Sequence, residues 1–376
     1  MVRTPAPPAI LRSICLPALL VLLGSLACVD HNPPGTTLFV FDGTSPSSVK
    51  VWNDVNKVYD AFNTPGAAVP APDRTVTSQN VMGTITLGWG GMVEDSTRNR
   101  LYLVSQGGTV YSIAKATTQN GDLSAIQDII SFTLGSAGDH FPSGAFGQAA
   151  LDPGTDTLYV QETSLDGAQT RIWYVAGVSN QFNQFPTPVN TFTATGDQWG
   201  SGLAAQGGVV YSLFGAGNSI TDNTGQAFTG PRLRMAQNLA FPFNTNVLIG
   251  SLTRLPGPTT WGSLAFDSQR SALYVYAQST SPAAVLVFNQ SQLSLNGLNQ
   301  APVRTLADAS LGNLRIIAHP PDSDWLLGAD SAAAPALTGA GTTNLRIWKN
   351  PSGGGAAVSG ALPVTEIRAV ALGGSN

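Results

Sequence analysis

Two arginines, Arg315 and Arg368, are the residues whose spacing is best suited to binding chemistry. Each follows a polar residue by two positions, Asn313 in one case and Glu366 in the other, within a short strand-like run. Two guanidinium groups in one confined space can clamp a carboxylate or a phosphate, because each presents several fixed N–H donors. The alternative is that the arginines pair with Glu366 or extend their charged ends to solvent. The sequence leaves both interpretations open.

Aromatic residues stand at the start of comparable hydrophobic runs. These residues are Trp89, Trp199 and Trp261, with Phe146 as a fourth. We expect them either to pack between neighbouring structural units or to form a collar for a sugar ring or an apolar ligand. We expect His140 and two long segments, 215–230 and 330–343, to form loops on the same side. Loops on a rigid scaffold are where recognition is usually built, so His140 joins the candidate ligand-binding residues.

Catalytic chemistry has little support in the sequence. Only three histidines are present, and His31 lies in a short polar segment near the N-terminus. We expect His140 and His319 on opposite faces of the fold, which argues against a two-histidine metal site. We find no nucleophile–base pair and no phosphate-binding loop. The sequence therefore favours a binding module over an enzyme, with no cofactor and no metal.

The elements that must position these residues repeat along the chain. The stretch WGSLAFDSQRSALYVYA, residues 261–277, has counterparts whose glycines recur every 50 to 62 residues: Gly90, Gly147, Gly200, Gly262 and Gly312. An aromatic residue follows each glycine by 11 to 13 positions: Tyr102, Tyr159, Tyr211, Tyr274 and Trp325. Three copies carry an aspartate five residues after the glycine: Asp95, Asp152 and Asp267. We expect these aspartates to cap the turn between two strands.

Each repeat predicts four strands, because β-branched and aromatic residues alternate between turns rich in Gly, Asp, Asn and Pro. The third strands are expected at Val49, Arg171, Val285 and Leu345, and fourth strands near Ala71 and Ala301. No segment shows a sustained helical stripe. A final run beginning at Glu366 has no partner after it, and the first run at Thr37 has none before it. The prediction is an all-β fold, a six-bladed β-propeller over residues 37–376 with four-stranded blades, closed by pairing the N- and C-terminal strands.

Over roughly residues 36–374 this repeat resembles six-bladed propellers of the NHL-repeat and TolB-like kind. Their L-A-V-D and L-Y-V pattern is similar to Leu264–Asp267 and Leu273–Val275. Such folds host binding proteins and enzymes alike. The resemblance implies, as the alternative function, a metal-dependent lactonase-like hydrolase, in which a Glu, an Asn and an Asp surround a central metal. Here Glu366 and Asn313 are the comparable inner residues, and the neighbouring arginines would repel a cation.

The innermost strand of each blade lines the central channel, so its alternation predicts the channel's character. The residues that follow the motif glycines, with Glu366 as the equivalent on the last strand, are polar or small: Gly91, Gln148, Ser201, Ser263 and Asn313. The next residue along each strand is mostly apolar, as in Met92 and Leu264. We therefore expect the first set to face a wet channel and the second to pack between sheets.

The N-terminus is expected to be a targeting segment. Arg3 and Arg12 precede a short apolar run, and the string LLGSLAC ends at Cys28. This string resembles a bacterial lipoprotein signal, which implies that residues 1–27 are a signal peptide and that Cys28 carries lipid. Residues 28–36 then form a Pro-rich tether. Ordinary secretion is the alternative, because Ser25 and Ala27 also fit a small-x-small cleavage site.

Composition limits the classes of partner. Charged residues make up 11% of the chain and the formal net charge is −4, so the composition shows no basic footprint for nucleic acid. We expect a monomer in the cell envelope that contacts the membrane through its lipid anchor. Its partner is expected to be an unidentified protein or a small anionic or carbohydrate ligand.

Overall fold

The computed structural model describes residues 35–375 apart from 44–45, 79–84, 124–127, 166–168, 182–190, 196, 218–219, 222–226, 229–231, 238–247, 255–261, 278–283, 294–300, 308–310, 312, 321–322 and 332–341.

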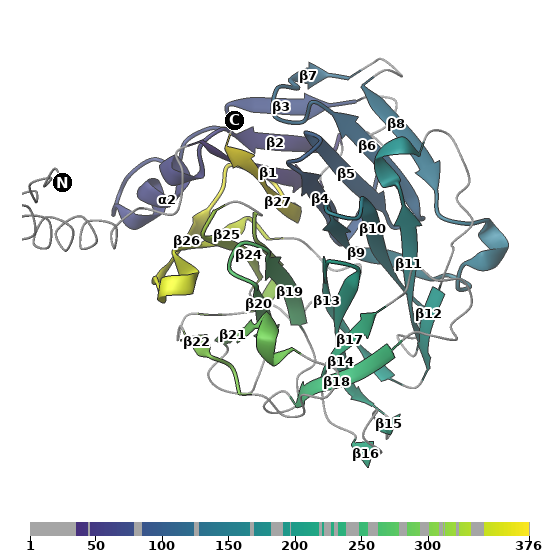
Figure 1. The fold of residues 1–376 in the computed structure, drawn as a ribbon. Coiled ribbons are helices and arrows are strands. Elements are labelled where there is room, and N and C mark those ends of the chain that lie inside the picture. The colour runs from purple at the N-terminus through teal and green to yellow at the C-terminus, as the bar shows by residue number, and fades with distance from the viewer. Residues whose placement is uncertain are drawn as a thin grey trace, which may run out of the picture.

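The described strands form six sheets of four or five strands around a ring, the arrangement of a β-propeller (Figure 1). The first sheet contains β27 (Ile367–Ser375), β1 (Thr36–Asp42), β2 (Ser48–Trp52), β3 (Arg74–Thr77) and β7 (Gly121–Asp122). The second contains β4 (Leu87–Asp95), β5 (Arg100–Ser105), β6 (Thr109–Ala114) and β8 (Ile129–Thr133). The third contains β9 (Ala145–Asp152), β10 (Thr157–Thr163), β11 (Gln169–Ala176) and β12 (Thr191–Thr195).

The remaining sheets follow the same order. The fourth contains β13 (Asp197–Gln206), β14 (Val209–Gly217), β17 (Arg232–Gln237) and β18 (Leu248–Arg254). The fifth contains β19 (Gly262–Asp267), β20 (Ala272–Ala277), β21 (Ala284–Asn289) and β22 (Arg304–Ala307). The sixth contains β23 (Asn313–Ala318), β24 (Trp325–Ser331), β25 (Asn344–Lys349) and β26 (Ala357–Ala361). A short ribbon of β15 (Ile220–Thr221) and β16 (Ala227–Phe228) lies within the predicted loop 215–230.

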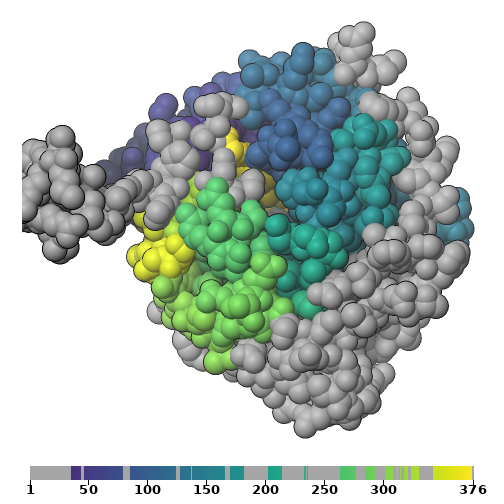
Figure 2. Space-filling model, viewed as in Figure 1, coloured from purple at the N-terminus to yellow at the C-terminus, as the bar shows by residue number. Residues whose placement is uncertain are grey.

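The predicted closure of the ring is confirmed. Strand β27 is the inner strand of the first sheet and pairs antiparallel with β1, with Phe39 opposite Ala371 and Val40 opposite Val370. The inner strands contact one another in a closed circle, β27 to β4, β9, β13, β19, β23 and back to β27. In Figure 2 the yellow C-terminal residues accordingly lie beside the purple N-terminal ones. Both ends of the described chain therefore complete one sheet.

The hydrophobic core is divided among six clusters of buried residues, each between two neighbouring sheets. The aromatic residues of the sequence repeat lie in five of these clusters, each at most 1% exposed: Tyr102, Tyr159, Tyr211, Tyr274 and Trp325. Burying one such side chain stabilises the fold by about 1.5–3 kcal/mol. The aromatic position of the sequence repeat thus marks residues that pack between neighbouring sheets.

The three repeat aspartates cap turns, as predicted. A carboxylate oxygen of Asp95 accepts a hydrogen bond from the backbone N–H of Arg98 at 3.2 Å. The carboxylates of Asp152 and Asp267 accept from Gly154 at 3.2 Å and from Arg270 at 2.9 Å. The three aspartates are buried, so each carboxylate depends on these donors for the hydrogen bonds that water would otherwise supply.

The expectation of no helical stripe is wrong at one place. Helix α2 (Val55–Asn63) begins at Asp54, whose side chain accepts a hydrogen bond from the backbone N–H of Asn56, and it packs on β1 and β26. Its apolar residues recur at three- and four-residue intervals, Val55, Val58, Tyr59 and Phe62, and face the cluster between the sixth and first sheets. Nine residues are enough for this stripe because the sheets supply the packing. Among the described residues, no helix is both long and apolar enough to cross a bilayer.

Candidate functional site

One predicted site cluster forms where β4 and β27 begin. Glu366 directly precedes β27, and its backbone N–H donates to the carboxylate of Asp42 at the end of β1. A guanidinium nitrogen of Arg368 lies 2.6 Å from a carboxylate oxygen of Glu366, with the two side chains 14% and 15% exposed. The same guanidinium lies 4.7 Å from the ring centroid of Trp89. Three predicted residues therefore meet, and the charge of Arg368 is balanced by a neighbouring carboxylate.

Trp89 itself is 5% exposed and belongs to the buried cluster between the sixth and first sheets. Its ring therefore packs between sheets and supports the Arg368 side chain by a cation–π contact, worth about 0.5–2 kcal/mol. This is the packing role that the sequence analysis offered beside an aromatic collar.

Several predicted residues cannot be added to this cluster. Arg315 and Asn313 lie on β23 and Trp199 lies on β13, but their side chains are outside the described part of the chain. Trp261 and Cys28 lie outside it altogether. Whether the two arginines meet is thus still a prediction.

His140 lies on the loop before β9 and packs on its own sheet. Its ring makes edge-on contacts with Phe146 and Trp173, with centroid distances of 5.1 and 5.3 Å. Buried Glu162 holds the neighbours of His140 in place. Its carboxylate accepts hydrogen bonds from the backbone N–H of Phe141 at 2.7 Å and from the indole of Trp173 at 2.8 Å. His140 therefore anchors a loop to an aromatic surface.

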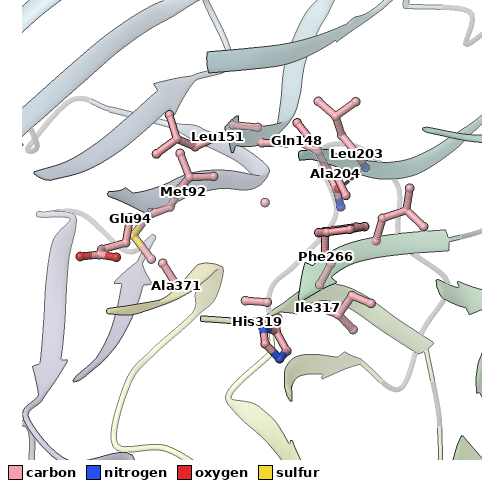
Figure 3. A pocket seen from close by; sticks show the side chains of 18 of the residues that line it. Met92, Glu94, Gln148, Leu151, Leu203, Ala204, Phe266, Ile317, His319 and Ala371 are labelled. Carbon is pink, nitrogen blue, oxygen red and sulfur yellow. Dashed lines mark hydrogen bonds between the residues drawn. The ribbon is translucent and has the colours of Figure 1, made fainter. Parts of the chain in front are cut away.

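A cavity of about 140 Å³ lies at the other end of the inner strands, towards their C-terminal ends. All six inner strands contribute to it, and its apolar lining includes Met92, Leu151, Leu203, Phe266, Ile317 and Ala371 (Figure 3). The cavity reaches the turns that follow the strands, because Pro153, Ser268 and His319 also line it. This cavity thus lies at the end of the inner strands opposite Arg368 and Glu366.

Two of the polar residues predicted to face a wet channel, Gln148 and Ser263, instead form hydrogen bonds between neighbouring inner strands. The side-chain carbonyl of Gln148 on β9 accepts from the backbone N–H of Leu203 on β13 at 3.0 Å, and its amide donates to the hydroxyl of Ser263 on β19 at 3.4 Å. That hydroxyl also accepts from the backbone N–H of Ile317 on β23 at 2.9 Å. Ser263 is 1% exposed, so the expectation of a wet channel is wrong at this position. Its hydroxyl is needed to satisfy a buried backbone donor.

Part of the cavity lining was predicted, because Gln148 was expected to face the channel and lines the cavity, whereas Met92 and Leu264 line it although they were expected to pack between sheets. The fourth residue after the motif glycine lines the cavity in four sheets: Glu94, Leu151, Ala204 and Phe266. The channel was predicted from the two positions that directly follow each glycine. The fourth position carries no shared residue type, so residue identity alone did not mark it.

A second cluster, Asp267, His319 and Asp324, joins the fifth and sixth sheets. One potential ligand atom from each side chain lies within 4.8 Å of the others. Two carboxylates and an imidazole are a donor set that divalent metals use. However, Arg270 lies against both carboxylates, with nitrogen–oxygen distances of 3.1 Å to Asp267 and 3.7 Å to Asp324. The guanidinium thus already supplies the positive charge that a metal ion would bring.

The same ion-pair pattern recurs between the second and third sheets. There Arg98 lies 3.0 Å from Asp95 and 3.6 Å from Asp156. Asp156 also accepts from the backbone and hydroxyl of Ser179, as Asp324 does from Ser352. The cavity lining beside this second arrangement includes Leu151 and Pro153, where the first arrangement has His319. Because the arginine–aspartate arrangement occurs both with and without a histidine, we interpret it as an ion-paired contact that joins neighbouring sheets, and we call it the clasp.

The surroundings of Asp267 favour its ionised carboxylate. Burial alone would raise the pKa of Asp267, but interactions with His319 and Arg270 outweigh it and hold that pKa below its ordinary value. Burial, reinforced by Asp324 and Asp267, raises the pKa of the Tyr274 phenol well above its usual range. This tyrosine stays neutral and its ring stacks on His319 at 5.4 Å.

No protein-family model matches the chain, and no curated protein matches it. Solved structures are similar to it at low sequence identity. TolB from Acinetobacter baumannii has a TM-score of 0.49 and 12% identity, covering 94% of this chain and 71% of that one. The PQQ-bound aldose sugar dehydrogenase from Streptomyces coelicolor has a TM-score of 0.44 and 15% identity, with coverages of 76% and 86%. Prolyl oligopeptidase B from Galerina marginata has a TM-score of 0.46 and 8% identity, with coverages of 90% and 41%.

Proposed function

We propose that this chain is a binding module of the bacterial cell envelope, a six-bladed propeller that holds a small ligand in its central cavity and is tethered by lipid on Cys28. The observation that carries the proposal is the cavity itself, to which all six inner strands contribute. A rigid ring with one shared cavity needs no moving part to bind a ligand, so little ordering entropy opposes binding.

The polar groups near the cavity favour a binding function over hydrolysis, because they already interact with other groups of the protein. A lactonase-like reaction needs a cation to polarise a carbonyl group and free carboxylates to hold that cation. The carboxylates of Asp267 and Asp324 contact Arg270. The side chain of Gln148 on β9 is hydrogen-bonded to β13 and β19. These groups stabilise the ring and leave a shaped space beside them.

The position of the first strand supports a tether on the cavity side. Thr36 pairs with Ser375 at the C-terminal end of β27, while Val370 and Leu372 of the same strand line the cavity. Residues 29–35 separate Cys28 from Thr36 and can span roughly 25 Å when fully extended. A lipid on Cys28 would therefore hold the cavity end of the ring near the membrane surface.

The tether and the binding site have separate tests. Mass spectrometry of the mature N-terminus should find a diacylated or triacylated Cys28, and an unmodified N-terminus overturns the tether. For the site, we expect a panel of small solutes to raise the melting temperature of the wild type in at least one chemical class. Ala318→Leu on the cavity wall should abolish that shift, whereas Ala361→Leu on the exposed outer strand β26 should keep it. No shift with any class, or equal shifts in both variants, would overturn the proposed site.

A further inference from the structure

The chemistry of the cavity wall restricts what the cavity can hold. Its lining is mainly methyl and methylene groups, the thioether of Met92 and the ring of Phe266. Phe266 is fixed by parallel stacking on Tyr211, with a centroid distance of 5.7 Å and an interplanar angle of 6°. No lysine or arginine is among the described residues that line it. An anionic ligand would find no lysine or arginine among these residues.

Three polar residues of the lining, Glu94, Gln148 and His319, interact with other residues of the protein. The side-chain carbonyl of Gln148 accepts a hydrogen bond from the backbone N–H of Leu203, and its amide donates one to the hydroxyl of Ser263. The carboxylate of Glu94 accepts a hydrogen bond from the hydroxyl of Ser96 at 2.5 Å. In Figure 3 this carboxylate points away from the other labelled residues of the lining. The Nε2 atom of His319 lies 3.3 Å from a carboxylate oxygen of Asp267.

The volume of the cavity gives a scale for the group that it can hold. A cavity of about 140 Å³ is close to the roughly 150 Å³ of an engineered apolar cavity that stays dry and binds benzene. A space of this size holds one six-membered ring or a branched hydrocarbon group of similar bulk. Moving a carboxylate or an ammonium group into it would remove that group's water without replacing its hydrogen bonds.

We infer that the cavity binds a neutral, apolar group about the size of one six-membered ring, presented by a small molecule. This inference rests on the proposed function, since it names the class of ligand for the same cavity. It differs from an anionic ligand held by the arginines, because Arg368 lies at the opposite end of the inner strands.

Four probes of similar size test the inference: toluene and methylcyclohexane as neutral groups, benzoate as an anion and benzylammonium as a cation. Calorimetry and melting temperature are measured on the mature protein. We expect both neutral probes to bind and to raise the melting temperature, with affinities at least tenfold above those of the charged probes. Amide NMR shifts should change for the cavity-lining residues of β9 and β19.

A matched pair of variants locates the binding. Leu151→Asn keeps the shape of a half-buried cavity residue but adds a polar amide, and it should weaken toluene binding about tenfold. Leu165→Asn makes the same change on a side chain that is 76% exposed and should leave binding unchanged. Equal affinity for charged and neutral probes would overturn the ligand class while the binding function stands. Silence of all four probes, or equal toluene binding in both variants, would overturn the cavity as the binding site and the ligand class with it.

Discussion

The Nε2 atom of His319 lies 3.3 Å from a carboxylate oxygen of Asp267, and solvent reaches neither side chain. The contact joins the fifth sheet to the sixth beside the cavity. We predict that His319→Ala and Asp267→Asn each lower the free energy of unfolding by about 1–3 kcal/mol, because each leaves a buried polar partner behind. A double-mutant cycle by urea unfolding should give a coupling of roughly 0.5–3 kcal/mol. Strict additivity would show that the pair does not interact.

The lowered pKa of Asp267 predicts the response to acid. A carboxylate with a lowered folded-state pKa stabilises the fold fully above its ordinary value of 3.8, and this contribution is lost as the pH falls below that value. The wild type should therefore lose stability more steeply than Asp267→Asn between about pH 4 and pH 2. Urea unfolding across this range measures both slopes. Parallel slopes would mean that Asp267 is not protonated more readily on unfolding.

Ring closure predicts a strong dependence on the last strand. Deleting residues 362–376 removes β27, the inner strand opposite Phe39 and Val40, and should abolish cooperative unfolding in calorimetry. A milder change, Phe39→Ala, empties a side chain that is 1% exposed and should cost about 3–5 kcal/mol. Val303→Ala, at a side chain that is 50% exposed, should stay within about 0.5 kcal/mol. A truncated chain that melts at the wild-type temperature contradicts the closure.

The strands could be predicted from sequence because each depends on local alternation. The hairpin of β19 and β20 follows directly from the residues between Gly262 and Ala277, and its turn from Asp267. The cavity depends instead on how six strands from distant parts of the chain converge. Its lining residues at one repeat position are as different as Glu94, Ala204 and Phe266. No pattern of residue type marks them, and the pairing of His319 with Asp267 becomes visible only after the sheets are packed.

The ion pair of Arg368 and Glu366 predicts that removing the carboxylate will create an anion-binding site at Arg368. With its charge balanced at 2.6 Å, Arg368 should give the wild type little affinity for phosphate. Glu366→Gln removes the negative charge and should raise phosphate affinity several-fold at low salt, because the guanidinium keeps its donors. The double variant Glu366→Gln with Arg368→Ala should lose that gain. Calorimetry that finds Arg368-dependent phosphate binding in the wild type would instead support an arginine clamp.

The tyrosines of the sequence repeat predict the response to alkali. Burial raises the pKa of Tyr211 to about 12, with a hydrogen bond to Gln290 as a partial offset, and burial also raises the pKa of Tyr102, Tyr159 and Tyr274. In the unfolded chain a tyrosine ionises near pH 10, so the folded state binds its proton more tightly and stability falls as the pH rises above that value.

Replacing one of these tyrosines isolates its share of the effect. Tyr211→Phe removes one group that ionises only on unfolding, so stability should fall less steeply between about pH 10 and pH 12, by up to roughly 1.4 kcal/mol per pH unit. Urea unfolding at several pH values gives the slope, and phenolate absorbance shows when ionisation occurs. In the wild type, the absorbance of the buried tyrosines should rise together with loss of the fold. If these phenols ionise while the protein is still folded, or if Tyr211→Phe leaves the slope unchanged, burial does not control their titration.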